Sequence, residues 1–286
     1  MIISPFTPLF FEKHKSDGIE SRYIQTFAQT DQILIELFVE KPFISTPTVA
    51  ITQAEDSVLG QILMTLIKIG DGYMYFCIIT GLSNGVYSIS ITPWGLQSQP
   101  FRVTDDEEEL SRTTLIQYSM KDNKQRQDAV FIIDGMRYFF DFRVPGGFKD
   151  SGWTFSVENE QFITPEADPI ELFALESTQK KFTMGYQEGV PVYFAELLNR
   201  VLTCSYVYFD GVRYARKDSS VPEMNVQIEG LDSFVFTQLL QKVNNLNPTL
   251  ENSNHLIMRR VQSNFGDTLY RATAISDNTL NKRIIQ

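Results

Sequence analysis

The residue types that most often carry catalysis or bind metals are sparse in this sequence. Its two histidines, His14 and His255, lie far apart in polar segments, so they do not form the local ligand pair typical of a zinc site. A serine–histidine–acid triad is defined by geometry rather than by order, but no Gly-x-Ser-x-Gly motif is present to hold the serine. The histidines therefore predict neither a metal site nor a hydrolase of this kind.

Carboxylates supply the remaining candidates for acid–base chemistry. Glu158 and Glu160 stand beside two aromatic residues and are the best available pair for a glycosidase. Asp141 is a further candidate, but it is more simply explained as the cross-strand partner of an arginine such as Arg143 or Arg137. We expect no catalytic residue, and hence no enzyme.

Two short motifs could suggest a bound ion or phosphate. The acidic run 105–109 lacks the spaced carboxylates and the glycine of a calcium loop, so it favours a solvated linker or a helix N-terminus. Residues 145–147, Pro-Gly-Gly, have neither the spacing nor the following helix of a phosphate loop. The sequence therefore predicts no metal and no cofactor.

Composition points to a folded, β-rich and acidic protein. The 286 residues include 22 Phe, 12 Tyr and 2 Trp, which favour strands, and the net charge is −10. A phosphate-binding protein needs a concentrated basic face, whereas the basic residues here are interleaved with acids or lie beside turns. The densest basic groups are Lys121, Lys124 and Arg126, and Arg213, Arg216 and Lys217. No nucleic-acid contact is expected beyond the lining of a channel.

Cysteine usage and apolar runs indicate where the chain is made. Cys77 and Cys204 lie in apolar runs and are expected to be buried thiols rather than a disulfide. The N-terminus lacks the features of a signal peptide, and no apolar stretch is long enough to span a membrane as a helix. We expect synthesis in the cytoplasm and no membrane contact.

Two similar sequence segments predict two tight turns. Residues 130–138 and 206–214 each place a β-branched and aromatic run on both sides of Asp-Gly. Asp134-Gly135 and Asp210-Gly211 supply the positive-φ residues that a two-residue hairpin turn requires. The repetition also raises an internal duplication as a hypothesis.

Residues 1–104 are expected to form a separable immunoglobulin-like β-sandwich. Strand-like runs spaced by roughly ten residues, with turn residues between them, are typical of that fold. The usual Cys…Trp…Cys core is absent. The expected strands are 23–28, 32–39, 48–52, 63–69, 73–80 and 86–92.

Residues 105–246 are expected to form a β-sandwich with one flanking α-helix over 191–202. Pro191 suits a first helical turn, and apolar residues recur on one helical face. The strands are expected at 113–118, 129–144 (a hairpin), 153–157, 170–175, 180–184 and 233–241, with a tight turn at 145–148. Residues 247–286 should add a hairpin, and a tail after Asn278 that becomes ordered only against a partner.

The aromatic cluster of the first hairpin is the candidate interface. Its composition matches that of protein interfaces, which are enriched in aromatic residues and arginine. Its members are Tyr138, Phe139, Phe140, Phe142 and Arg143. If both faces of this strand are covered, the aromatic residues belong to the core; if one is exposed, it forms a sugar platform or a protein interface.

From 113 to 242, the order of sheet, Asp-Gly hairpin, strands, single helix, Asp-Gly hairpin and strand resembles structural proteins of long-tailed bacteriophages. These are tail-tip, distal-tail and tube-related subunits. Segments 143–148, 156–162 and 220–224 are also similar to uncharacterised proteins of gut-bacterial phages and prophages. The resemblance implies a β-sandwich with a flanking helix, assembled into rings around a channel with other tail or baseplate subunits.

The predicted function is therefore structural and non-enzymatic. The chain is expected to be a subunit of a phage or prophage tail tip, forming a homo-oligomeric ring and residing in the virion once assembled. The alternative is a module that binds glycans or a host surface through aromatic patches. The mass of the protein in solution discriminates between the two hypotheses.

Overall fold

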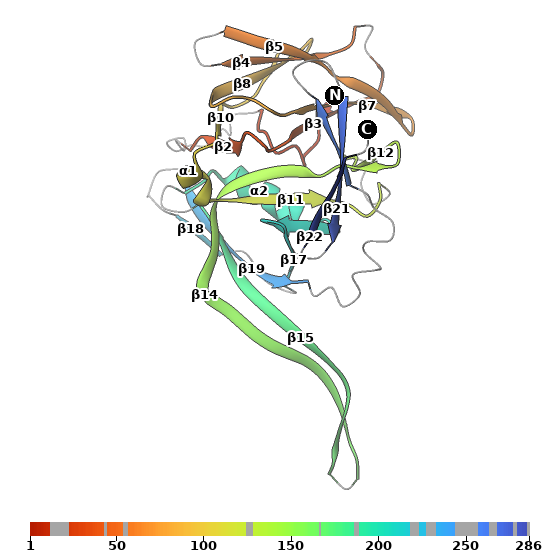
Figure 1. Cartoon of the computed structure of the whole chain (residues 1–286), viewed down its shortest axis with the longest axis vertical. Helices are drawn as coiled ribbons and strands as arrows, with labels where there is room; N and C mark the ends of the chain where they lie inside the picture. Colours follow the sequence, from red (N-terminus) through yellow and green to blue (C-terminus); the bar gives the residue numbers. More distant parts are fainter. Residues whose placement is uncertain are drawn as a thin grey trace.

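The computed structural model describes residues 1–11, 23–42, 45–53, 57–123, 128–165, 167–185, 189–217, 223–226, 233–243, 257–262, 268–276 and 279–284. Within these residues strands form five sheets, and two helices accompany them (Figure 1). The mainly β fold predicted from the sequence is confirmed. His14, His255 and the polar stretch 244–254 lie outside the described residues.

The first 104 residues form a sandwich of two sheets, as predicted for an immunoglobulin-like domain. One sheet has the order β1 (Ile2–Ile3), β3 (Ile33–Val39), β7 (Gly72–Ile79) and β6 (Thr65–Ile69). The other has the order β2 (Gln25–Ala28), β10 (Phe101–Thr104), β8 (Gly85–Thr92), β4 (Thr48–Gln53) and β5 (Ser57–Leu63), with β9 (Leu96–Gln97) beside β8. The facing sides of the two sheets share one apolar core, which stabilises the sandwich.

Strand β5 was not predicted as a separate strand. The expected strand 63–69 is divided by Met64, whose side chain is buried between β5 and β6. β5 is the end strand of one sheet and β6 is the end strand of the other. The apolar residues of β5 come in adjacent pairs rather than alternating, so the sequence lacks the usual strand pattern there.

The second region is built on a seven-stranded sheet that closes on itself. The strand order is β15, β14, β11, β16, β17, β19 and β18, and β15 also pairs with β19. The strands are β11 (Thr113–Ser119), β14 (Phe140–Ile163), β15 (Pro169–Met184), β16 (Tyr206–Phe209), β17 (Val212–Arg216), β18 (Glu223–Val226) and β19 (Phe234–Lys242). Because β15 pairs with both β14 and β19, six of these strands form a continuous ring of neighbours.

Both helices occur where the sequence indicated them. Helix α1 (Glu107–Ser111) begins after Asp106, whose side chain accepts a hydrogen bond of 2.8 Å from the Glu108 amide, so the acidic run is a helix N-terminus. Helix α2 (Val192–Val201) follows Pro191, as predicted. Its buried face consists of Phe194, Leu197, Leu198 and Val201.

Both Asp-Gly pairs form the predicted turns. Asp134 and Gly135 have φ values of 50° and 78°, and Asp210 and Gly211 have values of 47° and 81°. Positive φ at both central residues is the signature of a type I′ turn. The two turns belong to different sheets. The first joins β12 (Ile132–Ile133) and β13 (Met136–Arg137) in a separate two-stranded sheet, and the second joins β16 and β17 of the seven-stranded sheet.

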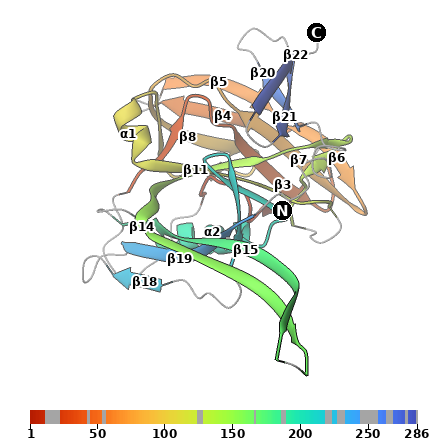
Figure 2. The ribbon, with the colours of Figure 1, turned by 60° about the horizontal axis from the view of Figure 1, so that its bottom comes forward.

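A long two-stranded arm replaces the predicted turn at 145–148. β14 continues through Gly146 and Gly147, and its outer part pairs with β15 as a hairpin that projects from the body (Figures 1 and 2). Glycine is required at Gly146, where φ is 128° and an added Cβ would lie 2.1 Å from the Thr183 carbonyl oxygen. The glycines therefore permit close strand pairing here, and the prediction of a turn was wrong.

The C-terminal segment is also more structured than predicted. Its antiparallel sheet comprises β20 (Ile257–Gln262), β21 (Thr268–Ser276) and β22 (Thr279–Ile284). The predicted hairpin corresponds to β20 and β21. The segment predicted as a tail forms β22, which pairs along β21, so backbone pairing within the chain orders it.

Candidate functional site

The predicted aromatic interface lies in the interior of the protein. Its five members have between 0% and 9% of their surface exposed. The Phe140 ring stacks on Tyr118 at 5.3 Å, and the Phe142 ring lies 5.6 Å from Phe194 of helix α2. Both faces of this part of β14 are therefore covered within the chain, and the prediction that it forms an intermolecular surface was wrong.

These aromatic residues belong to a core that joins the two regions. The same apolar cluster contains Phe6, Leu34 and Phe76 from the first region and Phe140 and Phe142 from the second. Residues 1–104 thus keep their own sheets but share part of their core with the residues that follow. We call this shared boundary the joint.

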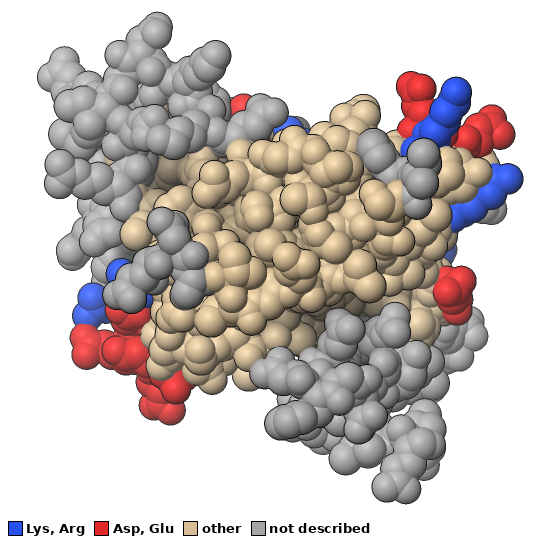
Figure 3. Space-filling model, turned by 90° about the horizontal axis from the view of Figure 1, so that it is seen from above, with Lys and Arg blue, Asp and Glu red and all other residues tan. Residues whose placement is uncertain are grey.

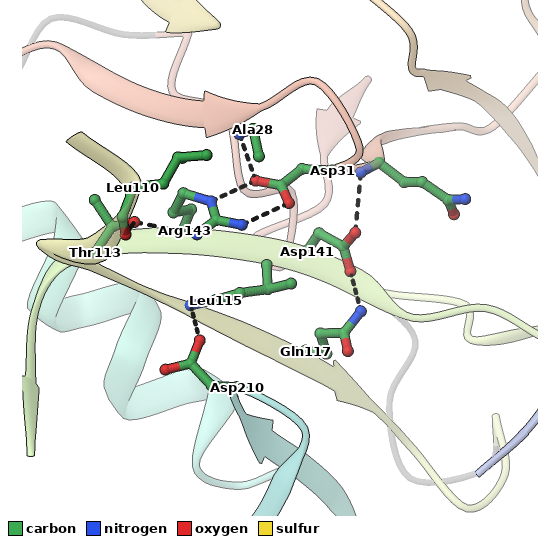
Figure 4. Close-up of polar contacts among 10 residues, drawn as sticks. Ala28, Asp31, Leu110, Thr113, Leu115, Gln117, Asp141, Arg143 and Asp210 are labelled. Carbon is green, nitrogen blue, oxygen red and sulfur yellow. Dashed lines mark hydrogen bonds and ion pairs between the residues drawn. The ribbon is translucent and has the colours of Figure 1, made fainter. Parts of the chain in front are cut away.

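A buried ion pair crosses the joint (Figure 4). The Arg143 guanidinium on β14 donates to both carboxylate oxygens of Asp31, with Nε–Oδ2 and Nη2–Oδ1 distances of 2.7 and 2.9 Å. Only 11% of the Arg143 side chain and 1% of the Asp31 side chain are exposed. Burial disfavours the charged guanidinium, but the bond to Asp31 and the attraction between the charges outweigh it and raise the pKa of Arg143.

Asp141 has different partners from those predicted. Its carboxylate accepts hydrogen bonds from the Gln32 amide at 2.9 Å and from Gln117 Nε2 at 2.8 Å (Figure 4). The Gln32 bond also crosses the joint, so Asp141 helps to secure it, and Arg143, which the sequence suggested as a cross-strand partner, lies on the same strand, β14. Sequence spacing could not show the contact with Gln32, because this donor lies more than 100 residues away in the sequence.

A fully buried carboxyl group, Glu36, also contributes to the joint. Its Oε2 accepts a hydrogen bond of 3.2 Å from the Val130 amide, and Oε1 has no hydrogen-bond partner among the described residues. Burial raises the pKa of Glu36 to about 8. The joint therefore contains charged and titratable groups whose contacts hold backbone and side chains across the boundary.

The other candidates for chemistry do not converge. Glu158 and Glu160 lie on the arm, close in sequence to Trp153 and Phe155, far from the carboxylates of the joint. The described residues contain no group of histidine, cysteine or acidic side chains that could hold a metal ion. Neither Cys77 nor Cys204 is in a disulfide, and Cys77 is buried. No helix in the described parts has the length and apolar character needed to cross a membrane.

The candidate functional surface is the arm, which we define as residues 153–165 and 167–178, the outer part of the β14–β15 hairpin. Trp153, Phe155 and Val157 are 44%, 75% and 62% exposed. The Trp153 and Phe155 rings stack at 5.8 Å with an interplanar angle of 16°, and Lys180 Nζ lies 3.3 Å from the centre of the Trp153 ring. Further exposed apolar residues toward the tip are Phe162, Ile163, Ile170 and Leu172.

A second exposed apolar surface lies on the other region. We define the β5–β6 edge by Val58, Leu59, Leu63 and Leu66, whose exposures are 59%, 53%, 67% and 43%. Between residues 57 and 70 the sequence has a single charge, Lys68. The end of the molecule opposite the arm is broadly uncharged (Figure 3).

Sequence reasoning missed both surfaces for an identifiable reason. Trp153, Phe155 and Val157 alternate with small polar residues, which is the usual pattern of a strand with one face in a core. The same pattern results when that face is left free on a projecting hairpin. The sequence feature that favours a free face over a buried one is the charge of the segment. Residues 150–179 contain seven acidic residues and no lysine or arginine.

Comparisons with known proteins assign no family to the chain. No protein-family model matches it, and no curated protein matches. One structural similarity was found, to a crystal structure described as Dpr2 Ig1-Ig2 in complex with DIP-Theta Ig1-Ig3. It covers 78% of this chain and 88% of the other at 9% identity, with a TM-score of 0.16, and it carries no argument about function.

Proposed function

We propose that this chain is a non-enzymatic structural subunit that assembles with copies of itself and with other subunits. The observation that carries the proposal is the arm, an exposed apolar hairpin that leaves the body of the protein. Isolated two-stranded hairpins are marginally stable in water, and contiguous exposed apolar surface usually marks an interaction site. A protein partner that covers the arm would satisfy both requirements.

The setting that we propose is the tail tip of a phage or prophage. The sequence resemblance supplies the class of assembly, a ring of β-rich subunits around a channel, with tail or baseplate proteins as neighbours. The rigid joint supports such a role, because a subunit in a ring must hold its two regions in a fixed orientation. The arm supplies an element long enough to reach a neighbouring subunit.

Sedimentation velocity and negative-stain microscopy of the full chain test this proposal. We expect closed rotational assemblies whose population increases with protein concentration, alone or after co-expression with the neighbouring gene products. The neighbouring genes should also include one of tape-measure length. A strict monomer under every one of these conditions would overturn the structural role.

The alternative is a glycan-binding module, and one observation favours it. The exposed rings of Trp153 and Phe155 stack on each other and form an aromatic platform, with the Lys180 ammonium over the Trp153 ring, and sugars can stack on exposed aromatic rings. Titration of the protein with oligosaccharides, followed by tryptophan fluorescence, tests this alternative. Trp153→Ala should abolish a saturable signal if the platform binds sugar, whereas substitution of Trp94, in the other region, should preserve it.

A further inference from the structure

The two uncovered apolar surfaces identified in the described residues lie at opposite ends of the molecule. In Figure 1 the tip of the arm lies at one end of the longest axis and β5 lies at the other. Two different surfaces that point away from each other suit a head-to-tail contact, in which one copy presents the first surface and the next copy presents the second. An arrangement with twofold symmetry would instead bring identical surfaces together.

We propose that the arm of one copy docks on the β5–β6 edge of a second copy. This inference rests on the proposed function and names the contact through which the chain would assemble. The arm contributes its face with Trp153, Phe155 and Val157, and the receiving copy contributes Leu59, Leu63 and their exposed neighbours. Repetition of the same contact around a ring would use every arm and every edge.

The apolar face of the arm carries one charge of each sign beside its apolar residues. Phe155 and Val157 share a face because side chains two residues apart in a strand point to the same side. By the same alternation, Glu160 belongs to the opposite face. Directly paired residues share a face, so Glu176, which is exposed and opposite Val157, and Lys180, which is opposite Trp153 and lies over its ring, stand beside the apolar side chains. Docking therefore removes apolar area from water and leaves Glu160 exposed.

Backbone groups could add to the side-chain contact. From residue 146 outward, β14 pairs with β15. Before Gln179, the described pairing of β15 is with β14 alone. Each strand of the arm therefore has one edge whose main-chain groups are not paired with another described strand. β5 is the end strand of its sheet and is likewise open on one side. An edge of the arm laid against β5 would extend that sheet by main-chain hydrogen bonds, a common mode of protein recognition.

Charge disfavours pairing between two arms. The arm and its base, residues 149–181, have seven acidic residues and three lysines, and because the lysines (Lys149, Lys180 and Lys181) all lie at the base, the acidic outer parts of two arms side by side would repel each other. The β5–β6 edge has no acidic residue between 57 and 70, and Lys68 is exposed there. The acidic residues Glu55, Asp56 and Asp71 flank this stretch in the sequence, so an acidic arm meets less repulsion at the edge itself than beside another arm.

The dimensions of the arm indicate a weak contact that gains strength by repetition. At about 3.3 Å per residue and about 10 Å across two strands, the segment from Trp153 to Ile163 presents roughly 300 Å² on each face. A standard interface buries about 800 Å² per partner. A closed ring gives every copy two such contacts, one through its arm and one through its edge, which favours closure over isolated pairs.

Two charge substitutions and a matched control test the contact. Phe155→Asp changes the apolar face of the arm, Leu63→Asp changes the edge, and Ser156→Asp adds the same charge to the opposite face of the arm. All three positions are exposed, so we expect cooperative unfolding by circular dichroism at the wild-type temperature. In sedimentation velocity Phe155→Asp and Leu63→Asp should each lose assembly by at least tenfold in concentration, and Ser156→Asp should assemble as wild type does.

Mixing the two defective variants gives the sharpest result. The Leu63→Asp copy keeps its arm and the Phe155→Asp copy keeps its edge, so the mixture should form a one-to-one dimer and nothing larger. A cysteine at Val157 in one copy and a cysteine at Leu59 in another should also become cross-linked, whereas a cysteine at Ser156 should not. Larger species in the mixture would contradict a head-to-tail contact through these two surfaces.

The outcomes separate this inference from the proposed function. If the wild-type chain assembles and either Phe155→Asp or Leu63→Asp assembles equally well, the arm-to-edge contact is wrong and the structural role stands. If the wild-type chain never associates with itself or with its neighbours, both are overturned. If only Phe155→Asp fails, the arm docks on a different surface and the receiving site proposed here is wrong.

Discussion

Arg143 and Asp31 form a bidentate ion pair across the joint, and both side chains are nearly excluded from water. One oxygen of Asp31, Oδ2, also accepts a hydrogen bond of 2.8 Å from the Ala28 amide. Arg143 in turn donates from Nη1 to Thr113 Oγ1 at 3.1 Å. The pair thus ties the turn before β3 to two strands of the second region, and it fixes how the two regions meet.

Removal of Asp31 should be costly because it leaves a buried guanidinium without its counter-ion. We expect Asp31→Ala to lower the free energy of unfolding by about 3–5 kcal/mol, and the double variant Asp31→Leu/Arg143→Met to lose less. Urea denaturation measures both. Glu108→Ala breaks a pair in which the side chains are 78% and 60% exposed, and it should cost under about 1 kcal/mol. Equal losses in the single and double variants would show that the ion pair is not the source of the effect.

Glu36 should make stability depend on pH. Its pKa is raised by burial from an ordinary value of 4.5 to about 8, so between these values the folded state holds a proton that the unfolded state has released. The free energy of unfolding should therefore fall by about 1 kcal/mol per pH unit as pH rises through this window, and level off above it. Glu36→Gln should remove that slope in urea denaturation between pH 5 and 9; parallel profiles for the two proteins would contradict the assignment.

The two Asp-Gly turns should tolerate asparagine better than valine. An added Cβ at Gly135 or Gly211 meets nothing within 4 Å, so any loss of stability comes from the positive φ and not from a clash. We expect Gly211→Val to cost roughly 1–2 kcal/mol, and Gly211→Asn to cost less, because asparagine adopts this conformation more readily. Thermal melts compare them, and equal melting temperatures for wild type and Gly211→Val would be inconsistent with a type I′ turn.

Helix α2 should depend on its buried face. Leu198 is 4% exposed, and Leu198→Asp would bury a carboxylate without a partner, with an expected cost of several kcal/mol. The control is Asn199→Asp on the exposed face, where the new carboxylate can still accept the 2.8 Å hydrogen bond from Arg216. A soluble Leu198→Asp protein that melts at the wild-type temperature would show that this face does not pack in the core.

The first 104 residues should be unstable alone, despite having complete sheets. Phe6, Leu34 and Phe76 pack in the shared core, and a fragment would expose them. The fragment would also lose the Arg143 partner of Asp31. We expect expression of 1–104 to give insoluble protein or a strongly lowered melting temperature, measured against the full chain by circular dichroism. A fragment as stable as the full chain would mean that the joint contributes little.

The sequence by itself determined the local features of this protein. Asp134-Gly135 and Asp210-Gly211 predicted their turns because a type I′ turn is defined by two adjacent residues. The spacing of Phe194, Leu197, Leu198 and Val201 predicted helix α2 because a helical face repeats over a few residues. The alternating strands of the first region predicted a sandwich, since that pattern is set by which face meets a core.

Only the tertiary structure decided which apolar faces are covered. The run from Tyr138 to Phe142 and the run from Trp153 to Val157 are both strand-forming and rich in aromatic or β-branched residues, yet the first is buried in the joint and the second is exposed on the arm. The difference depends on contacts with residues that are distant in the chain, such as Tyr118 and Phe194. The partner of Arg143 could not be predicted from the sequence either, because an ion pair between residues 112 positions apart produces no local sequence pattern.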